Sequence, residues 1–301
     1  MRDSGPGPIA DDRTFTVADA GREGAVCDPR NRRVKLYGFG REDLHGPELA
    51  RWRDGLTTCP DLYTKLTVYS RSDDEAAWVA AGWLYEGAIL GFFRDGAPAH
   101  LWAMYGDEAR SDAPRDAEHD AIVETAAAKE PVTPSLASGS FCHRADAAGA
   151  GAVAAIMGEV FPDYPTPITR GIIAEQIASG ANIFRFIVGE DGRLAASASA
   201  EIDHARRCAE LTDCATRPEE RGRGHMAYLL HRLARDLEQE QGITDLYTLA
   251  RADEPGMNCV FGKLGFRYTG RLINNCRMPN GWESMNIWCR GRGAAGPDAR
   301  A

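Results

Sequence analysis

The sequence predicts an α/β fold of the α+β kind, with a mixed, mostly antiparallel sheet flanked by helices. Three observations predict it. Residues 209–216 look like a short strand, and an Arg-Gly-x-Gly turn at 221–224 leads from them into a helix with apolar residues at 226, 229, 230, 233 and 237. Residues 183–188 and 194–202 form an expected hairpin over Glu-Asp-Gly. Gly242 is expected to end the helix before another strand at 246–250.

The segment before residue 138 repeats part of this order. Residues 62–69 alternate as a strand, 73–81 are predicted to be a helix, and 82–89 a strand pair. The succession of strand, Arg, short helix and Gly-aromatic matches residues 246–275. We therefore expect a partial copy of the C-terminal half, although unrelated strand-helix-strand units can look alike. Because it has no Arg-Gly-x-Gly turn, this copy should bind no cofactor.

These patterns divide the chain into five parts. Residues 1–30 are expected to be a disordered tail, because Gly, Asp, Arg and Pro occur there without periodicity. The N-terminal domain spans 31–106, and 107–138 is expected to be a linker with a helical turn near Ile122. The C-terminal domain spans 139–290, with a strand from Phe141, helices at 147–160 and 172–177 and a Pro-stiffened loop at 161–168. A second tail covers 291–301.

Composition excludes several classes of protein. The net charge of −9 argues against nucleic acid as a partner. No apolar run reaches the length that spans a bilayer, and the first residues lack the apolar core of a signal peptide. We therefore expect a soluble, cytoplasmic protein without membrane contact, and a homo-oligomer stays possible. The eight cysteines form no Cys-x-x-Cys pair, and His204 and Cys208 have ordinary strand and turn positions, so no metal is expected.

The Arg-Gly-x-Gly turn is the most informative motif. Glycines let the backbone approach a ligand, and the first amides of the following helix are unpaired, which suits a pyrophosphate. The only Gly-Lys, at Gly262, lacks the hydroxyl residue of a P-loop. Only two glycines fit a dinucleotide fingerprint. Taken alone, the turn could also be a Gly-rich link before a surface helix.

The segments after the turn carry a resemblance. A strand at 246–250, a break at 254–256, a helix at 257–264 and Lys-Leu-Gly-Phe at 263–266 resemble the GNAT superfamily of acetyl-CoA-dependent N-acetyltransferases. The resemblance implies acetyl-CoA as acetyl donor. The implied cofactor-binding residues are three strand positions with pantetheine-facing amides, the turn and helix start, and one Asn: Cys214, Ala215, Thr216, Arg221, Gly222, Arg223, Gly224, His225, Met226 and Asn258.

The resemblance is narrower than the superfamily. Five segments between about residues 138 and 290, among them 161–168, 198–203 and 270–275, resemble the β-lysine N-acetyltransferases in the expected order. Residues 33–36 and 87–93 extend it over most of the chain. It implies that a small cationic amino acid, β-lysine (3,6-diaminohexanoate), is acetylated on its ε-amine to Nε-acetyl-β-lysine, a compatible solute. Another small amine or a protein amine is the first alternative.

Acetyl transfer requires a neutral amine, whereas an ε-amine has a pKa of about 10.4. Some GNAT enzymes carry a catalytic glutamate on the strand before the turn, so the resemblance implies Glu210 as the catalytic base. It could instead be an ordinary strand carboxylate or a salt-bridge partner of the substrate. The predicted substrate-binding residues are Tyr164, Glu201, Asp213, Asn274 and Asn275, although solvated carboxylates and an Asn turn would look the same.

One departure from the family concerns the departing thiolate. Where many GNAT enzymes have a proton-donating Tyr, this chain has Phe261. The proton then comes from water or from another residue, such as Tyr268 or Tyr247, or the thiolate leaves unprotonated. The same departure leaves open a non-catalytic acyl-CoA-binding module.

Overall fold

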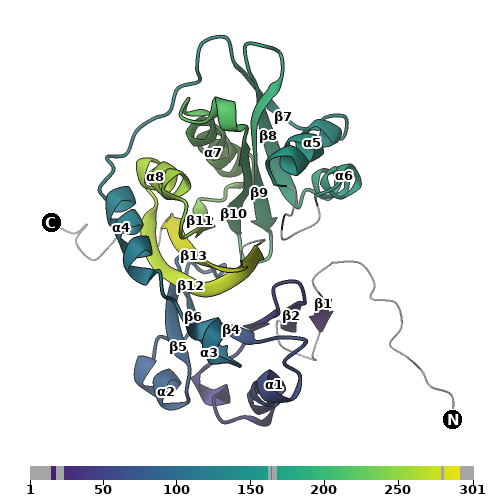
Figure 1. Cartoon of the computed structure of the whole chain (residues 1–301). Helices are drawn as coiled ribbons and strands as arrows, with labels where there is room; N and C mark the ends of the chain where they lie inside the picture. Colours follow the sequence, from purple (N-terminus) through teal and green to yellow (C-terminus); the bar gives the residue numbers. More distant parts are fainter. Residues whose placement is uncertain (1–14, 18–23, 162–163, 165–167, 279–280, 292–301) are drawn as a thin grey trace.

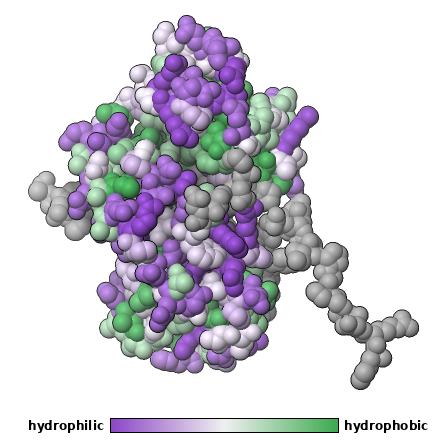
Figure 2. Space-filling view, viewed as in Figure 1, coloured by the Kyte–Doolittle hydropathy of each residue, from purple (hydrophilic) through white to green (hydrophobic). Residues whose placement is uncertain are grey.

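The chain was analysed as a computed structural model, and the structure describes residues 15–17, 24–161, 164, 168–278 and 281–291. One sheet, with strand order β1-β2-β3-β4-β6-β5-β12-β13-β11-β10-β9-β8-β7, runs through the whole described chain. Figure 1 shows it bridging two lobes, with the C-terminal half above and the N-terminal half below. Polar residues dominate the face seen in Figure 2, where apolar residues form only small patches.

The C-terminal half has the order expected from the sequence. Its elements are β7 (Phe141–Arg144), α5 (Ala150–Val160), α6 (Arg170–Ser179), β8 (Asn182–Val188), β9 (Leu194–Asp203), β10 (Cys208–Thr216), a 3-10 turn (Pro218–Glu220), α7 (His225–Asp236) with a π-helical end (Leu237–Gln241), β11 (Asp245–Arg251), α8 (Pro255–Lys263), β12 (Arg267–Met278) and β13 (Gly281–Arg290). Neighbouring strands are antiparallel, except that β10 and β11 are parallel.

Helices cover both faces of this half of the sheet. The buried leucines of α7 share one core cluster with Ile183 of β8 and with the alanines of β9. Small side chains on β9 let the helix approach closely. Phe184 belongs instead to the cluster with α5 and α6. Because adjacent strand residues point to opposite faces, α7 lies on one face and α5 and α6 lie on the other. Gly242 ends the helical segment with φ 62°, as the sequence predicted.

The N-terminal half has a core of its own. Its elements are β1 (Phe15–Val17), β2 (Gly24–Asp28), β3 (Arg33–Tyr37), a 3-10 turn (Arg41–Asp43), α1 (Pro47–Thr58), β4 (Lys65–Ser70), α2 (Glu75–Ala80), β5 (Leu84–Ile89) and β6 (Ala99–Tyr105). Trp78, Trp83 and Trp102 are buried at its centre, with the rings of Trp78 and Trp102 stacked at 5.3 Å. Burial of such large side chains supplies much of the hydrophobic stabilisation of a small lobe.

The two halves have the same strand connections. β2 and β3 are an antiparallel pair like β9 and β10, and β3 and β4 are a parallel pair around α1, like β10 and β11 around α7. β4-β6-β5 then mirrors β11-β13-β12. A partial copy predicts this repetition, and superposition of residues 62–92 on 246–275 is the remaining test of the prediction.

The halves meet where β5 pairs with β12. Gly87 and Gly270 face each other there with φ values of 131° and 149°, and a Cβ added to Gly270 would lie 2.4 Å from the Cα of Gly87. Beside them Lys65 Nζ lies 2.8 Å from Glu86 Oε1 and donates to the carbonyl of Ile273 at 2.7 Å. The main-chain amide of Ile273 donates to the same carboxylate oxygen at 2.6 Å. A buried ion pair therefore joins β4 and β5 to β12.

The structure corrects three sequence predictions. The expected tail contains β2, which pairs with β3. The expected linker contains two helices, α3 (Glu108–Ser111) and α4 (Asp116–Ala127). Arg271 of β12 forms ion pairs of 2.9 Å with Asp116 and Asp120, which hold α4 against the C-terminal half. Residues 82–89 contribute one strand rather than a strand pair, and its hairpin partner is β6, which the sequence analysis did not predict.

Candidate active site

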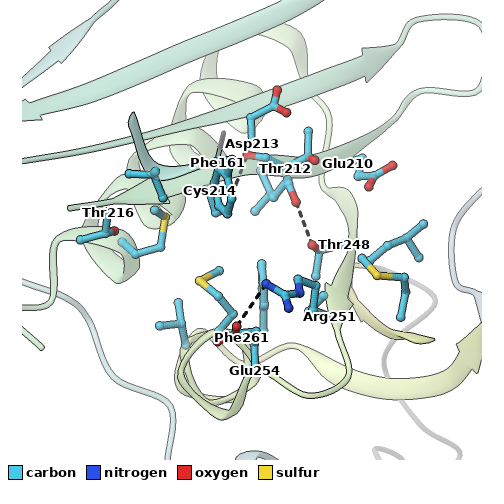
Figure 3. A pocket seen from close by; sticks show the side chains of 18 of the residues that line it. Phe161, Glu210, Thr212, Asp213, Cys214, Thr216, Thr248, Arg251, Glu254 and Phe261 are labelled. Carbon is cyan, nitrogen blue, oxygen red and sulfur yellow. Dashed lines mark hydrogen bonds and ion pairs between the residues drawn. The ribbon is translucent and has the colours of Figure 1, made fainter. Parts of the chain in front are cut away.

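The site lies where two parallel strands separate. The recorded pairing of β10 with β11 covers only three residue pairs and ends at Glu210 with Tyr247. Beyond it, a bulge between Thr212 and Ala215 bends β10 away. Thr248 Oγ1 bridges the opening by donating to the carbonyl of Leu211 at 2.8 Å. The result is a cavity of about 810 Å³, and Figure 3 shows it between the β10 side chains and those of β11 and α8.

The Arg-Gly-x-Gly turn forms one end of this cavity. Gly222 and Gly224 both have φ 80°, a conformation that favours glycine, and no atom lies within 4 Å of a Cβ added to either. Gly224 is the N-cap of α7 and no side chain caps the helix, so its first amides are free to bind an anion. Arg221, His225 and Met226 also line the cavity. These residues fit a pyrophosphate.

The remaining turn residues have supporting contacts. His225 Nε2 lies 3.0 Å from Glu220 Oε2, and the guanidinium of Arg223 lies 3.3 Å from the same carboxylate. Glu220 therefore holds the turn together. Arg223 is not among the described residues that line the cavity. Its predicted cofactor contact stays a prediction without geometric support.

The three predicted β10 residues differ in what they present to the cavity. Cys214 and Thr216 line it, whereas Ala215 pairs with Ser197 of β9 and buries its side chain in the cluster under α5. Ala215 can thus contribute only main-chain groups. Burial raises the pKa of the Cys214 thiol, so Cys214 stays a neutral thiol.

Asn258 has a structural role instead of the predicted cofactor contact. Its side-chain NH₂ donates to the carbonyls of Arg251 and Glu254 at 2.9 and 2.8 Å. Its Oδ1 accepts from Asn286 and from the indole of Trp288, both at 2.9 Å. The side chain is fully buried, and these four bonds leave it no capacity for a ligand. Asn258 fixes α8 against β11 and β13.

The predicted base lies in a group of acidic residues. Glu210 on β10 and Glu201 on β9 are direct cross-strand neighbours, and both line the cavity. Burial, and then the charge of Glu201, raise the pKa of Glu210 to about 7, against the opposing effects of Lys35 and of a hydrogen bond from Tyr247. Glu201 is open to the cavity. Partial loss of water around its carboxylate raises its pKa as well, and the charge of Lys35 opposes this rise.

Asp213 and Tyr164 are brought together, as a shared substrate role requires. The bulge gives Asp213 a φ of 51° and turns it toward Tyr164, whose hydroxyl donates to Asp213 Oδ1 at 3.2 Å. Ser199 donates to Oδ2 at 2.6 Å. Burial raises the pKa of Asp213, and these two hydrogen bonds oppose the rise. Residues 162–163 and 165–167 of the predicted loop, which include its three prolines, lie outside the described residues.

The two predicted asparagines separate. Asn275 is buried and lines the far end of the cavity, and its carbonyl accepts from Arg33 at 3.2 Å. Asn274 does not line the cavity. Its side chain donates to the carbonyls of Arg110 and Asp112 at 3.0 and 2.7 Å, so it holds α3 against β12. The substrate role predicted for Asn274 is therefore corrected to a structural one.

The N-terminal half also contributes to the cavity, which was not expected from the sequence. Asn31, Arg33 and Lys35 all line the cavity. Alternation in β3 puts Val34 and Leu36 in the lobe core and Lys35 on the other face, which is a signal that the sequence carries. That Lys35 faces the cavity next to β10 becomes clear only from the way the continuous sheet brings the two halves together.

Phe261 lines the cavity from α8, buried and packed on Phe266 at 5.3 Å. Of the two alternative tyrosines, Tyr247 hydrogen bonds to Glu210, and Tyr268 packs on Trp288 at 5.8 Å without lining the cavity. In the part of the chain that the structure describes, no cluster of three or more His, Cys, Asp or Glu suits a metal. Among the same residues, no helix is long and apolar enough to cross a membrane.

An anion cradle joined to a carboxylate-lined cleft suits a ligand with a phosphate group and a cationic partner, and comparison with known proteins identifies the class of enzyme. The profile of the acetyltransferase (GNAT) family matches residues 153–266. A β-lysine N(6)-acetyltransferase of Methanosarcina mazei is 34% identical over 249 residues, which cover 75% of this chain and 90% of that protein. The N-acetyltransferase YodP of Bacillus subtilis is 33% identical over 227 residues, which cover 75% and 82%.

The chain belongs to the GNAT family and is an N-acetyltransferase. Among solved structures, a spermidine N-acetyltransferase variant from Vibrio cholerae matches with a TM-score of 0.44 and 15% identity, over 51% of this chain and 94% of that one. An N-acetyltransferase from Staphylococcus aureus matches with a TM-score of 0.45 and 17% identity, over 50% and 98%.

Replacing Gly224 by valine is expected to raise KM for acetyl-CoA by about 10- to 100-fold, the loss expected when charged hydrogen bonds are removed. The side chain would enter the open space in front of the free amides. Gly180→Val is the matched control, because Gly180 also has positive φ and open space but lies outside the cavity. Steady-state kinetics with varied acetyl-CoA measure both variants. Equal KM values would contradict the assignment of the cradle.

Proposed function

We propose that the chain transfers an acetyl group from acetyl-CoA to the ε-amine of β-lysine and forms Nε-acetyl-β-lysine. The observation that carries this proposal is one continuous cavity with an anion cradle at one end and three carboxylates, Glu201, Glu210 and Asp213, farther in. The relatives named β-lysine N(6)-acetyltransferases support the choice of amine. The product is a net-neutral zwitterion suited to a compatible solute, and we place its synthesis in the cytoplasm, where acetyl-CoA is available.

The proposed cofactor fits the residues present. Gly222 and Gly224 leave open space at the free amides of α7, and Arg221 adds a positive charge to the same end. Beyond Glu210, β10 has no further ladder pair with β11, and apart from the Leu211 carbonyl, which accepts from Thr248, its main chain borders the same cavity. When bound, acetyl-CoA supplies an activated acyl group as a thioester. The main-chain groups of the separated strands would hydrogen bond to its pantetheine arm, as they would to an added strand at the edge of a sheet.

Glu210 is the proposed base. A carboxylate with a pKa of about 7 is half ionised at neutral pH, so it can take a proton from the substrate ammonium and pass it on. Tyr247 donates a hydrogen bond that orients this carboxylate. Glu201 and Asp213 supply negative charge for the amines, and Tyr164 and Ser199 fix the orientation of Asp213. Phe261 has no proton to give, so the sulfur either takes its proton from water or another residue or leaves as a thiolate.

Release of coenzyme A with a panel of amines tests the proposal. β-Lysine, α-lysine, spermidine and a peptide with a free N-terminus are compared at equal enzyme and acetyl-CoA. We expect kcat/KM for β-lysine to exceed each of the others by roughly 10-fold or more, because a misplaced charge pair costs at least that much. Preference for spermidine or the peptide would redirect the search to another amine. Binding of acetyl-CoA without release on any amine would support the non-catalytic module.

A further inference from the structure

Lys35 is an N-terminal residue that reaches the reaction cavity. Lysine occurs at only four positions in this chain, and Lys35 lies on β3, on the face opposite Val34 and Leu36. It lines the main cavity and also a second cavity of about 320 Å³. Glu201 and Glu210 line both cavities too. Lys35 therefore borders both cavities together with the predicted base.

The neighbouring cations are already neutralised. Arg33 forms a two-pronged contact of 2.9 Å with Asp28. Arg206 is bound to Asp203 at 2.5 Å and lies over the rings of Tyr37 and Phe92. Lys35 differs from both.

Among the described residues, Lys35 takes part in no hydrogen bond or ion pair, although Glu210 is near enough to act on its charge. Its pKa is raised, chiefly by Tyr69 and also by Tyr37 and Glu210, while burial opposes the rise, so the side chain stays charged at neutral pH. A charged ammonium that faces a cavity without a fixed partner is a ready site for a ligand anion.

The strand pairing explains how this residue comes to lie there. Lys35 is the third residue of β3 in its parallel pairing with β4, and Glu210 is the third recorded residue of β10 in its parallel pairing with β11. The two residues hold equivalent places in the two halves, with opposite charge. The N-terminal half, which has no cradle, thus adds a cation to a site that is otherwise acidic.

We infer that Lys35 binds the carboxylate of the amino acid acceptor and selects amino acids over polyamines. The inference rests on the proposed function, because it assumes that the acceptor carries both an ammonium and a carboxylate group. The charged residues that line the cavity are complementary to such a molecule: Glu201, Glu210 and Asp213 suit its amines, and Lys35 suits its carboxylate. A polyamine would leave Lys35 unpaired next to further positive charge, which costs binding free energy.

Two amines that differ only in the carboxylate group provide the test. β-Lysine and 1,4-diaminopentane share the same chain and amines, apart from the missing acid group of the latter. For Lys35→Met we expect KM for β-lysine to rise by about 10- to 100-fold, with KM for acetyl-CoA unchanged. The wild-type preference for β-lysine over 1,4-diaminopentane should shrink by the same factor. Lys35→Arg should restore part of it, and Lys129→Met, outside both cavities, should leave it unchanged.

The ratio between the two amines separates carboxylate binding from an effect on Glu210. Loss of Lys35 also removes a charge that lowers the pKa of Glu210, but that change acts equally on both amines. A preference that survives in Lys35→Met while wild-type enzyme uses β-lysine overturns the inference and leaves the proposed function intact. If α-lysine is the acceptor instead, the same comparison with 1,5-diaminopentane decides. An acceptor without a carboxylate overturns both.

Discussion

Replacement of Glu210 by glutamine is expected to lower kcat by about 100- to 10,000-fold, the usual contribution of a general base. KM for acetyl-CoA should change little, because the cradle is at the other end of the cavity. Glutamine keeps the shape of the side chain and can still accept the hydrogen bond from Tyr247, but it cannot take a proton. Steady-state kinetics with each substrate varied measure the effect. A variant that keeps more than a tenth of the wild-type kcat would contradict the role of Glu210.

The same residue predicts the pH dependence. The base acts only when ionised, so kcat/KM for the amine should rise as pH rises through about 7. Removal of the neighbouring charge in Glu201→Gln should move this limb to lower pH, because Glu201 raises the pKa of Glu210. Failure of the limb to move would show that the limb reports another group.

Stability measurements can show that Glu210→Gln remains folded. In the wild type, the pKa of Glu210 rises from an ordinary value near 4.5 to about 7 on folding, so the folded state holds this proton more tightly than the unfolded chain does. Ionisation of Glu210 therefore costs stability as pH rises from about 4.5 through 7. Glu210→Gln lacks this cost, and we expect its melting temperature at pH 8 to equal or exceed that of the wild type.

Replacement of Lys65 by methionine is expected to destabilise the protein by about 3–5 kcal/mol. Lys65 and Glu86 are both buried, and loss of the ammonium leaves the carboxylate without its counter-charge. Chemical denaturation gives the free energy of unfolding. Lys129, which follows the C-terminal end of α4, provides the control: Lys129→Met should change the free energy of unfolding by no more than about 0.5 kcal/mol.

A double variant keeps this prediction decisive if the single variant is too unstable to purify. In Lys65→Met with Glu86→Gln, the neutral amide can still accept from Ile273 and needs no counter-charge. We expect it to be more stable than Lys65→Met alone. A loss below about 1 kcal/mol in the single variant would mean that the ion pair does not hold the two halves together.

Local patterns were sufficient to predict the C-terminal half. The leucine spacing of α7, the left-handed Gly242 and the turn glycines are encoded in neighbouring residues, and the structure shows them where the sequence placed them. The full extent of α4 could not be found in this way, although a helical turn was expected near Ile122, which lies within it. Its stabilising contacts are ion pairs from Arg271 and the close approach of Gly262 to Ala126, which come from more than 130 residues away.

The family resemblance pointed to Glu210 as the candidate base and to Glu201 on the neighbouring strand as an anchor. The structure brings both side chains to the cavity, whereas their roles stay predictions. Asn258 was misassigned because its partners, Asn286 and Trp288, lie on a strand whose pairing the sequence does not reveal. Lys35 was missed because only the continuous sheet through β5 and β12 brings β3 near β10.

The position of the acetyl group in the product tests the central claim most directly. The purified chain is incubated with acetyl-CoA and β-lysine, and the product is analysed by mass spectrometry and two-dimensional NMR. A single monoacetylated product with the acetyl group on the ε-nitrogen is the predicted result. Acetylation of the β-amine, or no product from β-lysine when another amine is consumed, would contradict it.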